Sequence, residues 1–299
     1  MDSKFNFIVS RRSMLGIAGS AMAAVGLAGC SSDDASSDSG SSTGSDATDV
    51  TKLTVTEGKL TVATGNPAYT PWVMDDDPES GEGFEAALIY KLAEQMGFDD
   101  DDVVWVRTTF DEAYAPGDKD WDLNIQQVSI SDERKKAVDF SPAYFRPTQA
   151  VVVQKSSKYA DATACSDFAD ATVAVMTGTT AYDYVMDLLK DGSDEGIDVF
   201  DDNSAAAQAV SAGQCDAFVT DTPQSVYIVE SEQIEDGVVV GQIPGTEDEY
   251  GLGICLPKDS ELTAYVTDAL NALIDDGTLQ DLQDEWLAAY TTDIPTLTD

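Results

Sequence analysis

From Lys59 onward, the sequence alternates short apolar, β-branched runs with stretches of helical period. This alternation is typical of α/β folds with mostly parallel sheets. The chain has 299 residues, 42% of them hydrophobic, so it can bury a sizeable core. Strands are expected at Leu60–Thr64, Val103–Val106, Leu123–Val128, Ala150–Val153, Thr172–Met176, Ile197–Phe200 and Ala217–Thr220, and helices at Phe84–Met96, Thr180–Lys190, Ser204–Ala212, Leu262–Ile274 and Leu279–Tyr290.

The charge and composition exclude several functions. The chain carries 56 acidic and 16 basic residues, a net charge of -40, and such a field repels phosphate backbones. Nucleic acid is therefore not an expected partner. The chain has no histidine, which excludes a Ser-His-Asp relay and histidine metal sites. The Asp75–Asp77 run lacks the spacing of a calcium loop. We expect no metal, no cofactor and no enzyme of the commonest kinds.

The N-terminal segment has the pattern of an export signal. Ser10–Leu15 resembles a twin-arginine motif, and the weakly hydrophobic run Gly16–Gly29 is shorter than the roughly 20 residues that span a bilayer. Leu27–Cys30 resembles a lipobox, so residues 1–29 are expected to be a signal peptide and Cys30 to carry lipid. Polar residues follow, predicting a disordered linker over residues 30–57. These features place the protein outside the cytoplasm, anchored to the cell membrane.

Three further cysteines lie beyond the lipobox: Cys165, Cys215 and Cys255. In an oxidising compartment, Cys165 and Cys215 can form a disulfide, and three buried thiols are an equally good alternative.

Hydroxyl and guanidinium groups follow one expected strand, in the segment Ser129–Arg134. Ligands of open α/β sheets bind at the carboxyl ends of strands. Locally, Ser131 is a suitable N-cap, and Arg134 can be a solvated surface charge. The functional alternative gives Arg134 a ligand carboxylate to bind in bidentate fashion, with Ser129 and Ser131 donating beside it.

Two more strand ends carry candidate site residues. Gly178, Thr179 and Thr180 lie at the start of an expected helix, whose N-terminal amides can bind an anion. Taken alone, a glycine turn with a threonine cap is the better explanation of this segment. Asp221 follows another strand and is either a helix cap or the partner of a ligand ammonium group.

Aromatic residues form a fourth candidate group. Tyr69 and Trp72 lie in the loop after the first strand, and Phe110 follows the second. Such residues are most often part of the core, but two rings facing a cleft can enclose a side chain.

In chain order, these segments resemble the bacterial extracellular solute-binding proteins of family 3, the polar amino-acid receptors of ABC importers. The resemblance spans about Lys59 to Tyr290. It rests on Leu60–Thr64, Gly83–Glu85, Trp121–Leu123, Ser129–Arg134, Asp139–Tyr144, Gly178–Thr180, Asp216–Asp221 and Asp276–Thr278 before Trp286.

The resemblance implies a two-lobed periplasmic-binding-protein fold of type II. Two α/β lobes would be joined by two crossing hinge strands, with the ligand between them. The first lobe is expected to comprise residues 58–147 plus 250–299, and the second residues 148–249.

The resemblance also implies roles for individual residues. Arg134 would bind the carboxylate of a free amino acid with Ser129 and Thr180, and Asp221 would bind its ammonium group. Tyr69 and Phe110 would flank the side chain, and the backbone carbonyl of Gln127 would accept from the ammonium group. The remaining expected site residues are Ser131, Met176, Gly178 and Thr179.

The implied function is that of a monomeric receptor that delivers its ligand to the permease and ATPase subunits of an ABC importer. Gly65 and Asn66 stand where cation-binding relatives use an acid, which favours a polar uncharged or aliphatic ligand side chain. Two alternatives remain open at this point: a lyase or dehydratase on the same fold, and a sensor that presents its closed form to a signalling partner.

Overall fold

In the computed structural model, which describes residues 49–247 and 251–299, the apolar run Leu60–Gly65 forms strand β1, all of whose residues are buried. It lies in a five-stranded sheet of order β2-β1-β3-β10-β4, parallel to β2 and β3, whereas β10 is antiparallel to β3 and β4. The other strands of this sheet are β2 Val103–Thr108, β3 Leu123–Asn124, β4 Val138–Phe145 and β10 Leu252–Pro257.

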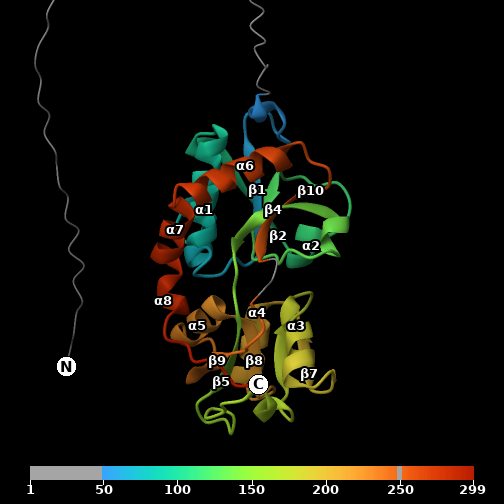
Figure 1. Cartoon of the computed structure of the whole chain (residues 1–299), viewed down its shortest axis with the longest axis vertical. Coiled ribbons are helices and arrows are strands. Elements are labelled where there is room, and N and C mark those ends of the chain that lie inside the picture. The colour runs from blue at the N-terminus through green and yellow to red at the C-terminus, as the bar shows by residue number, and fades with distance from the viewer. Residues whose placement is uncertain (1–48, 248–250) are drawn as a thin grey trace, which may run out of the picture. The chain divides into compact units, whose positions relative to one another are not determined.

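Helices α1, α6 and α7 pack on this first sheet (Figure 1). Apolar side chains at helical spacing, such as Leu88, Ile89 and Leu92 of α1, meet Leu60 and Val62 of β1 in one buried cluster. Gly83 and Gly97, both at positive φ, bracket α1 and fix its length. The helices of this lobe are α1 Phe84–Met96, α2 Phe110–Tyr114, α6 Leu262–Asp275 and α7 Thr278–Trp286.

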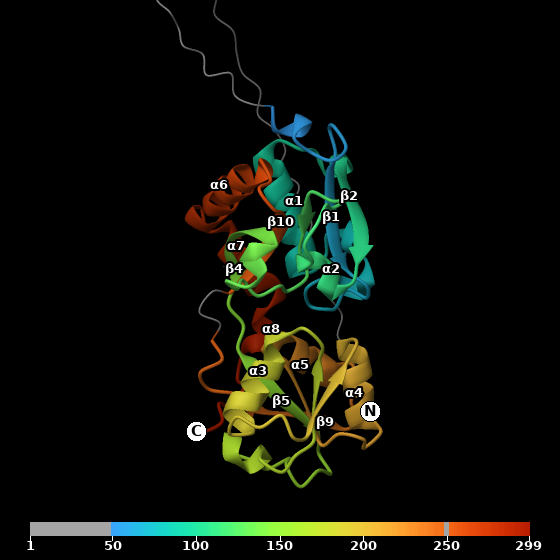
Figure 2. The same ribbon diagram turned by 90° about the vertical axis from the view of Figure 1, so that its right-hand side faces the viewer.

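A second five-stranded sheet has the order β7-β6-β8-β5-β9. Strands β6, β7 and β8 run parallel, whereas β5 is antiparallel to β8 and β9. Helices α3 and α4 lie on opposite faces of this sheet (Figure 2). Each face has an apolar cluster, one that includes residues of α3 and one that includes residues of α4. Its elements are β5 Gln149–Gln154, β6 Val173–Met176, α3 Thr180–Tyr184, β7 Ile197–Phe200, α4 Asn203–Ser211, β8 Ala217–Asp221, α5 Thr222–Glu230 and β9 Gly237–Gln242.

The two sheets confirm the predicted α/β fold with two lobes. The chain passes from the first sheet to the second between β4 and β5, and returns between β9 and β10. After α8 (Ala288–Thr291), the C-terminal tail reaches the second sheet, where Thr296 bridges Gln242 and Thr298 bridges Ala164. Buried Leu297 packs into the second core at this point. The expected first lobe includes these tail residues, whereas the structure places them on the second sheet.

Several expected elements differ from the structure. The expected helix Thr180–Lys190 is α-helical only to Tyr184 and continues as a π-helical turn, Val185–Leu189. The expected strand Leu123–Val128 is only two residues long, because the chain leaves the sheet and Gln127 adopts a φ of +56°. The expected helix beginning near Ser131 is a single 3-10 turn, Arg134–Lys136.

The expected linker over residues 30–57 is ordered at its C-terminal end. Asp49 caps a short 3-10 turn, Val50–Lys52, and the Val55 N–H donates to Asp122 at 2.7 Å. The signal peptide, Cys30 and the rest of the linker lie outside the described residues.

The three other cysteines are buried free thiols, which favours that alternative over the disulfide. Burial is the main cause that raises the pKa of Cys215 and of Cys255 to about 12, so both stay protonated at neutral pH. Across residues 49–247 and 251–299, no helix has the length and apolar character needed to cross a membrane.

Candidate ligand-binding site

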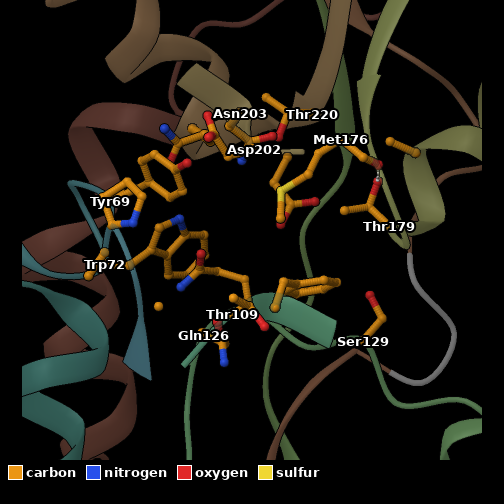
Figure 3. Close-up of a pocket in the computed structure, with 18 of the residues that line it drawn as sticks. Tyr69, Trp72, Thr109, Gln126, Ser129, Met176, Thr179, Asp202, Asn203 and Thr220 are labelled. Carbon is orange, nitrogen blue, oxygen red and sulfur yellow. Dashed lines mark hydrogen bonds between the residues drawn. The ribbon is translucent and has the colours of Figure 1, made fainter. Parts of the chain in front are cut away.

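A cavity of about 240 Å³ lies between residues of the two lobes (Figure 3). Strand ends and the loops after them supply its lining, as expected for an open α/β sheet. Nine of the eleven residues predicted for the site line it: Tyr69, Phe110, Gln127, Ser129, Arg134, Met176, Thr179, Thr180 and Asp221.

Arg134 is held from three directions. Its Nη1 donates to the Ser129 carbonyl at 2.7 Å and its Nη2 to the Gly178 carbonyl at 2.8 Å. The guanidinium carbon lies 4.4 Å from the ring centroid of Tyr114 and 5.6 Å from that of Phe110. A guanidinium has five N–H donors, so donors remain for a carboxylate in the cavity.

Ser131 and Gly178 do not line the cavity and act behind Arg134 instead. Ser131 Oγ accepts from the Arg134 N–H at 3.1 Å and so holds the backbone before the 3-10 turn, whose N-cap residue is Glu133. Gly178 has a φ of +71°, and a Cβ there would lie 2.5 Å from the Tyr114 hydroxyl oxygen. Glycine therefore suits both the positive φ and the close approach of this turn to α2.

Asp221 ends β8, beside the first residue of β5. Gln149 is its register partner, and Gln149 Nε2 donates to Asp221 Oδ1. Asp221 occupies the N-cap position of α5 but makes no side-chain capping bond. The capping alternative is therefore not what the structure shows, and the carboxylate faces the cavity together with Gln149.

Thr179 and Thr180 begin α3. Thr179 holds the N-cap position without a side-chain capping bond, since its hydroxyl donates to the Met176 carbonyl at 2.8 Å. Met176 is the last residue of β6, and its side chain points into the cavity (Figure 3).

The aromatic group divides between cavity and core. Trp72 lines the cavity but is 1% exposed, and it packs against Phe84 and Phe145 at centroid distances of 6.1 and 5.6 Å. Tyr69 and Phe110 are partly buried lining residues. Burial, followed by the negative charge of Asp202, raises the pKa of Tyr69.

Gln127, which has a positive φ, is bound by Glu85. Glu85 is completely buried on α1 and accepts from the Gln127 N–H at 2.9 Å, from Gln127 Nε2 and from the Tyr144 hydroxyl. Burial raises the Glu85 pKa to about 7, against the lowering effect of these donors. Glu85 therefore fixes a cavity residue without facing the cavity itself.

Several buried polar atoms at the cavity have no hydrogen-bond partner among the described residues. Both amide atoms of Gln224 are unpaired, as are Gln149 Oε1 and Thr64 Oγ1. These side chains are 2%, 3% and 1% exposed. Because an unpaired buried polar atom is costly, they indicate a cavity that receives a polar ligand.

Sequence patterns alone did not identify several of the polar lining residues, among them Gln126, Gln149, Asp201, Asp202, Asn203 and Gln224. Each of three such residues has an ordinary local role that gives no sign of a site: Gln149 begins a strand, Asp202 caps a helix and Gln224 lies in the first turn of a helix. The Gln126–Gln127 pair at a strand end carried a signal, but only its second member was predicted.

Residues 60–289 match the sequence model of the bacterial extracellular solute-binding proteins, family 3. The L-cystine-binding protein TcyJ of Escherichia coli K12 is 30% identical over 228 residues, covering 75% of this chain and 81% of that protein.

Solved structures of amino-acid-binding proteins are similar to this chain as well. An ancestral arginine-binding protein bound to arginine is similar at a TM-score of 0.64 and 29% identity, over 77% of this chain and 99% of that one. The ancestral amino acid-binding protein AncCDT-1, a precursor of cyclohexadienyl dehydratase, is similar at a TM-score of 0.61 and 30% identity, over 77% and 95%.

Proposed function

The chain belongs to the bacterial extracellular solute-binding proteins of family 3, and we propose that it captures a free amino acid between its lobes and delivers it to an ABC importer. The single observation that carries the amino-acid assignment is the pairing of opposite charges in one cavity: Arg134 from the first lobe and Asp221 from the second.

A zwitterion is the ligand that fits this pair. Its carboxylate would accept hydrogen bonds from the remaining N–H groups of Arg134, beside Ser129 and Thr180. Its ammonium group would pair with the Asp221 carboxylate and donate to the Gln127 backbone carbonyl. Burial of a charged group is unfavourable unless it is paired, and charge-assisted hydrogen bonds contribute about 1.5 to 3 kcal/mol each. A ligand that bridges both lobes favours their closed arrangement, which permease and ATPase subunits would then recognise.

The relatives support a binding role. Those reported above are named for binding L-cystine, arginine or amino acids in general. An enzyme would need an acid of raised pKa at its ligand. Glu85 has such a pKa, but it does not line the cavity and its oxygens are occupied by Gln127 and Tyr144. This favours a receptor over a lyase or dehydratase, and a sensor would use the same binding step.

The anchor is a further part of the proposal. Residues 1–29 would direct export and be removed, Cys30 would carry lipid, and the polar residues after it would tether a monomeric binding domain to the cell membrane. Replacing Cys30 with Ser tests this: the variant should appear in the soluble extracytoplasmic fraction, whereas the unchanged chain should stay with the membrane. An equal distribution of both would exclude the lipid anchor.

A thermal-shift screen tests the receptor role. The full-length chain is melted in the presence of each of the twenty amino acids and L-cystine, and any positive result is titrated by calorimetry. A ligand that binds only the folded state raises the melting temperature. Selective stabilisation by one or a few amino acids is expected, and no shift with any of them would contradict the proposal.

A further inference from the structure

We infer that the cavity selects an amino acid whose side chain ends in a positively charged nitrogen group, and that Asp202 binds that group. The inference rests on the proposed function, since it concerns the side chain of the amino acid that Arg134 and Asp221 would hold. It extends that function by naming the class of ligand.

The charges that line the cavity are not balanced. Among the described lining residues, Arg134 is the only cation, and it is accompanied by three acids: Asp201, Asp202 and Asp221. A zwitterion pairs Arg134 with its carboxylate and Asp221 with its ammonium group, and therefore leaves Asp201 and Asp202 uncompensated. Asp201 is exposed to solvent, whereas Asp202 is partly buried, so Asp202 gains most from a cationic partner.

Asp202 lies away from the groups assigned to the carboxylate. Figure 3 shows the side chains of Tyr69, Asp202 and Asn203 on one side of the cavity, and those of Ser129 and Thr179 on the other. The effect of the Asp202 charge on Tyr69 supports their proximity. An amino acid bound by its α-groups near Ser129 thus directs its side chain toward Asp202.

The carboxylate of Asp202 is held in place and keeps binding capacity. It is the N-cap of α4, where one oxygen, Oδ1, accepts from the Ala205 N–H at 2.8 Å. Asp202 forms no salt bridge with any Lys or Arg in the described ranges. A capping aspartate has two oxygens, so the second can accept from a ligand ammonium or guanidinium group.

Other lining groups suit a cationic side chain. Tyr69 and Trp72 line the cavity, and aromatic rings attract cations. Gln224 is 2% exposed, and neither atom of its amide has a partner, so a nitrogen-rich group has a buried acceptor available besides Asp202. This buried amide points to a polar ligand independently of the acidic residues.

The loop after β1 has no acidic residue for a cationic side chain, and Asp202 of the second lobe takes that role instead. Gly65 and Asn66 line the cavity without a charge, which led to the expectation of an uncharged ligand side chain. Asp202 comes instead from the β7–α4 connection, more than a hundred residues later in the chain.

Matched ligand pairs test the inference by calorimetry on the full-length chain. Arginine is compared with citrulline, in which a neutral carbonyl oxygen replaces a charged nitrogen group, and lysine is compared with norleucine, which lacks the terminal ammonium group. The same titrations use Asp202→Asn, which keeps a good N-cap but loses the charge. Asp276→Asn is the matched control, since Asp276 also receives a backbone N–H, from Thr278, at a helix start outside the cavity.

The unchanged protein should prefer the charged member of at least one pair by tenfold or more. Asp202→Asn should reduce that preference to threefold or less, with the affinity for the neutral member within threefold, and Asp276→Asn should keep the original preference. Neutral amino acids binding as well as charged ones, or an unchanged preference in Asp202→Asn, would overturn the inference and leave the receptor proposal standing. Binding of no amino acid at all would overturn both.

Discussion

Burial controls the protonation of Glu85, which does not line the cavity but binds the cavity residue Gln127. Its pKa is raised to about 7 from an ordinary value near 4.5. Between pH 4.5 and pH 7, the folded protein therefore keeps a proton on Glu85 that the unfolded chain has already released. The resulting stabilisation is complete below the unfolded pKa, declines as pH rises through about 7, and amounts to about 3 kcal/mol at most.

Glu85→Gln tests this linkage. The wild-type free energy of unfolding should fall between pH 5 and pH 8 by more than that of the variant, because glutamine does not titrate. Urea denaturation at both pH values measures the difference. Other acids titrate too, so only the difference between the two proteins is diagnostic, and identical pH dependence would contradict the assigned pKa.

Gln149 orients Asp221 and has an unpaired oxygen of its own at the cavity. Gln149→Leu should weaken binding of the preferred amino acid by roughly three- to tenfold. The reason is that the Asp221 carboxylate loses a hydrogen bond that contributes about 1 kcal/mol. Calorimetry measures the effect, and Gln154→Leu on the same strand, outside the cavity, is the control. Equal losses in both variants would show that Gln149 acts only through the strand.

At the scale of elements, Gly178 controls how closely α3 and its preceding turn approach α2. Gly178→Ala would place a Cβ 2.5 Å from the Tyr114 hydroxyl oxygen and 2.8 Å from Asp111 Oδ1. We expect ligand affinity to fall at least tenfold, because the Tyr114 and Asp111 side chains must shift to admit the Cβ, which disturbs the contact between Arg134 and the Gly178 carbonyl.

Gly213→Ala is the matched control for this change. Gly213 has nearly the same φ, +70°, but nothing lies within 4 Å of its added Cβ. Both variants should lose about 1 kcal/mol of stability from the positive φ. Only Gly178→Ala should lose affinity, and a similar loss of affinity in both would contradict the role of the close contact.

The sequence predicted elements well where local signals agree with the fold. Helix α1 has the predicted bounds, because its apolar period is bracketed by Gly83 and Gly97. Strands β4, β9 and β10 were not among the expected strands: Pro142 lies within β4, and glycines lie within β9 and β10. Their pairing is a tertiary effect that no local pattern reveals.

The same distinction applies to the cavity. Arg134 and Asp221 follow strands and sit in recognisable motifs, so their position at the cavity was predictable. Asp202 and Gln224 belong to helix starts whose local roles conceal them. Only the packing of α4 and α5 on the second sheet brings these residues to the same cavity as Arg134.

At the scale of the whole molecule, the net charge of -40 opposes folding through self-repulsion. Raising NaCl from about 50 mM to about 500 mM shortens the screening length severalfold and should raise the melting temperature by several degrees. Sucrose at matched osmolality is the control for non-specific stabilisation. A melting temperature that falls or does not move with salt would contradict this account of the acidity.

The central claim is that Arg134 and Asp221 hold the two charges of one free amino acid. Calorimetry with the preferred amino acid and its methyl ester, which lacks the carboxylate charge, tests it most directly. The unchanged protein should bind the free acid at least tenfold more tightly than the ester, or by about 1.4 kcal/mol. Arg134→Ala should bind both weakly and equally, whereas Asp221→Asn should keep the discrimination at lower affinity. If Arg134→Ala still distinguishes acid from ester as the unchanged protein does, the claim is wrong.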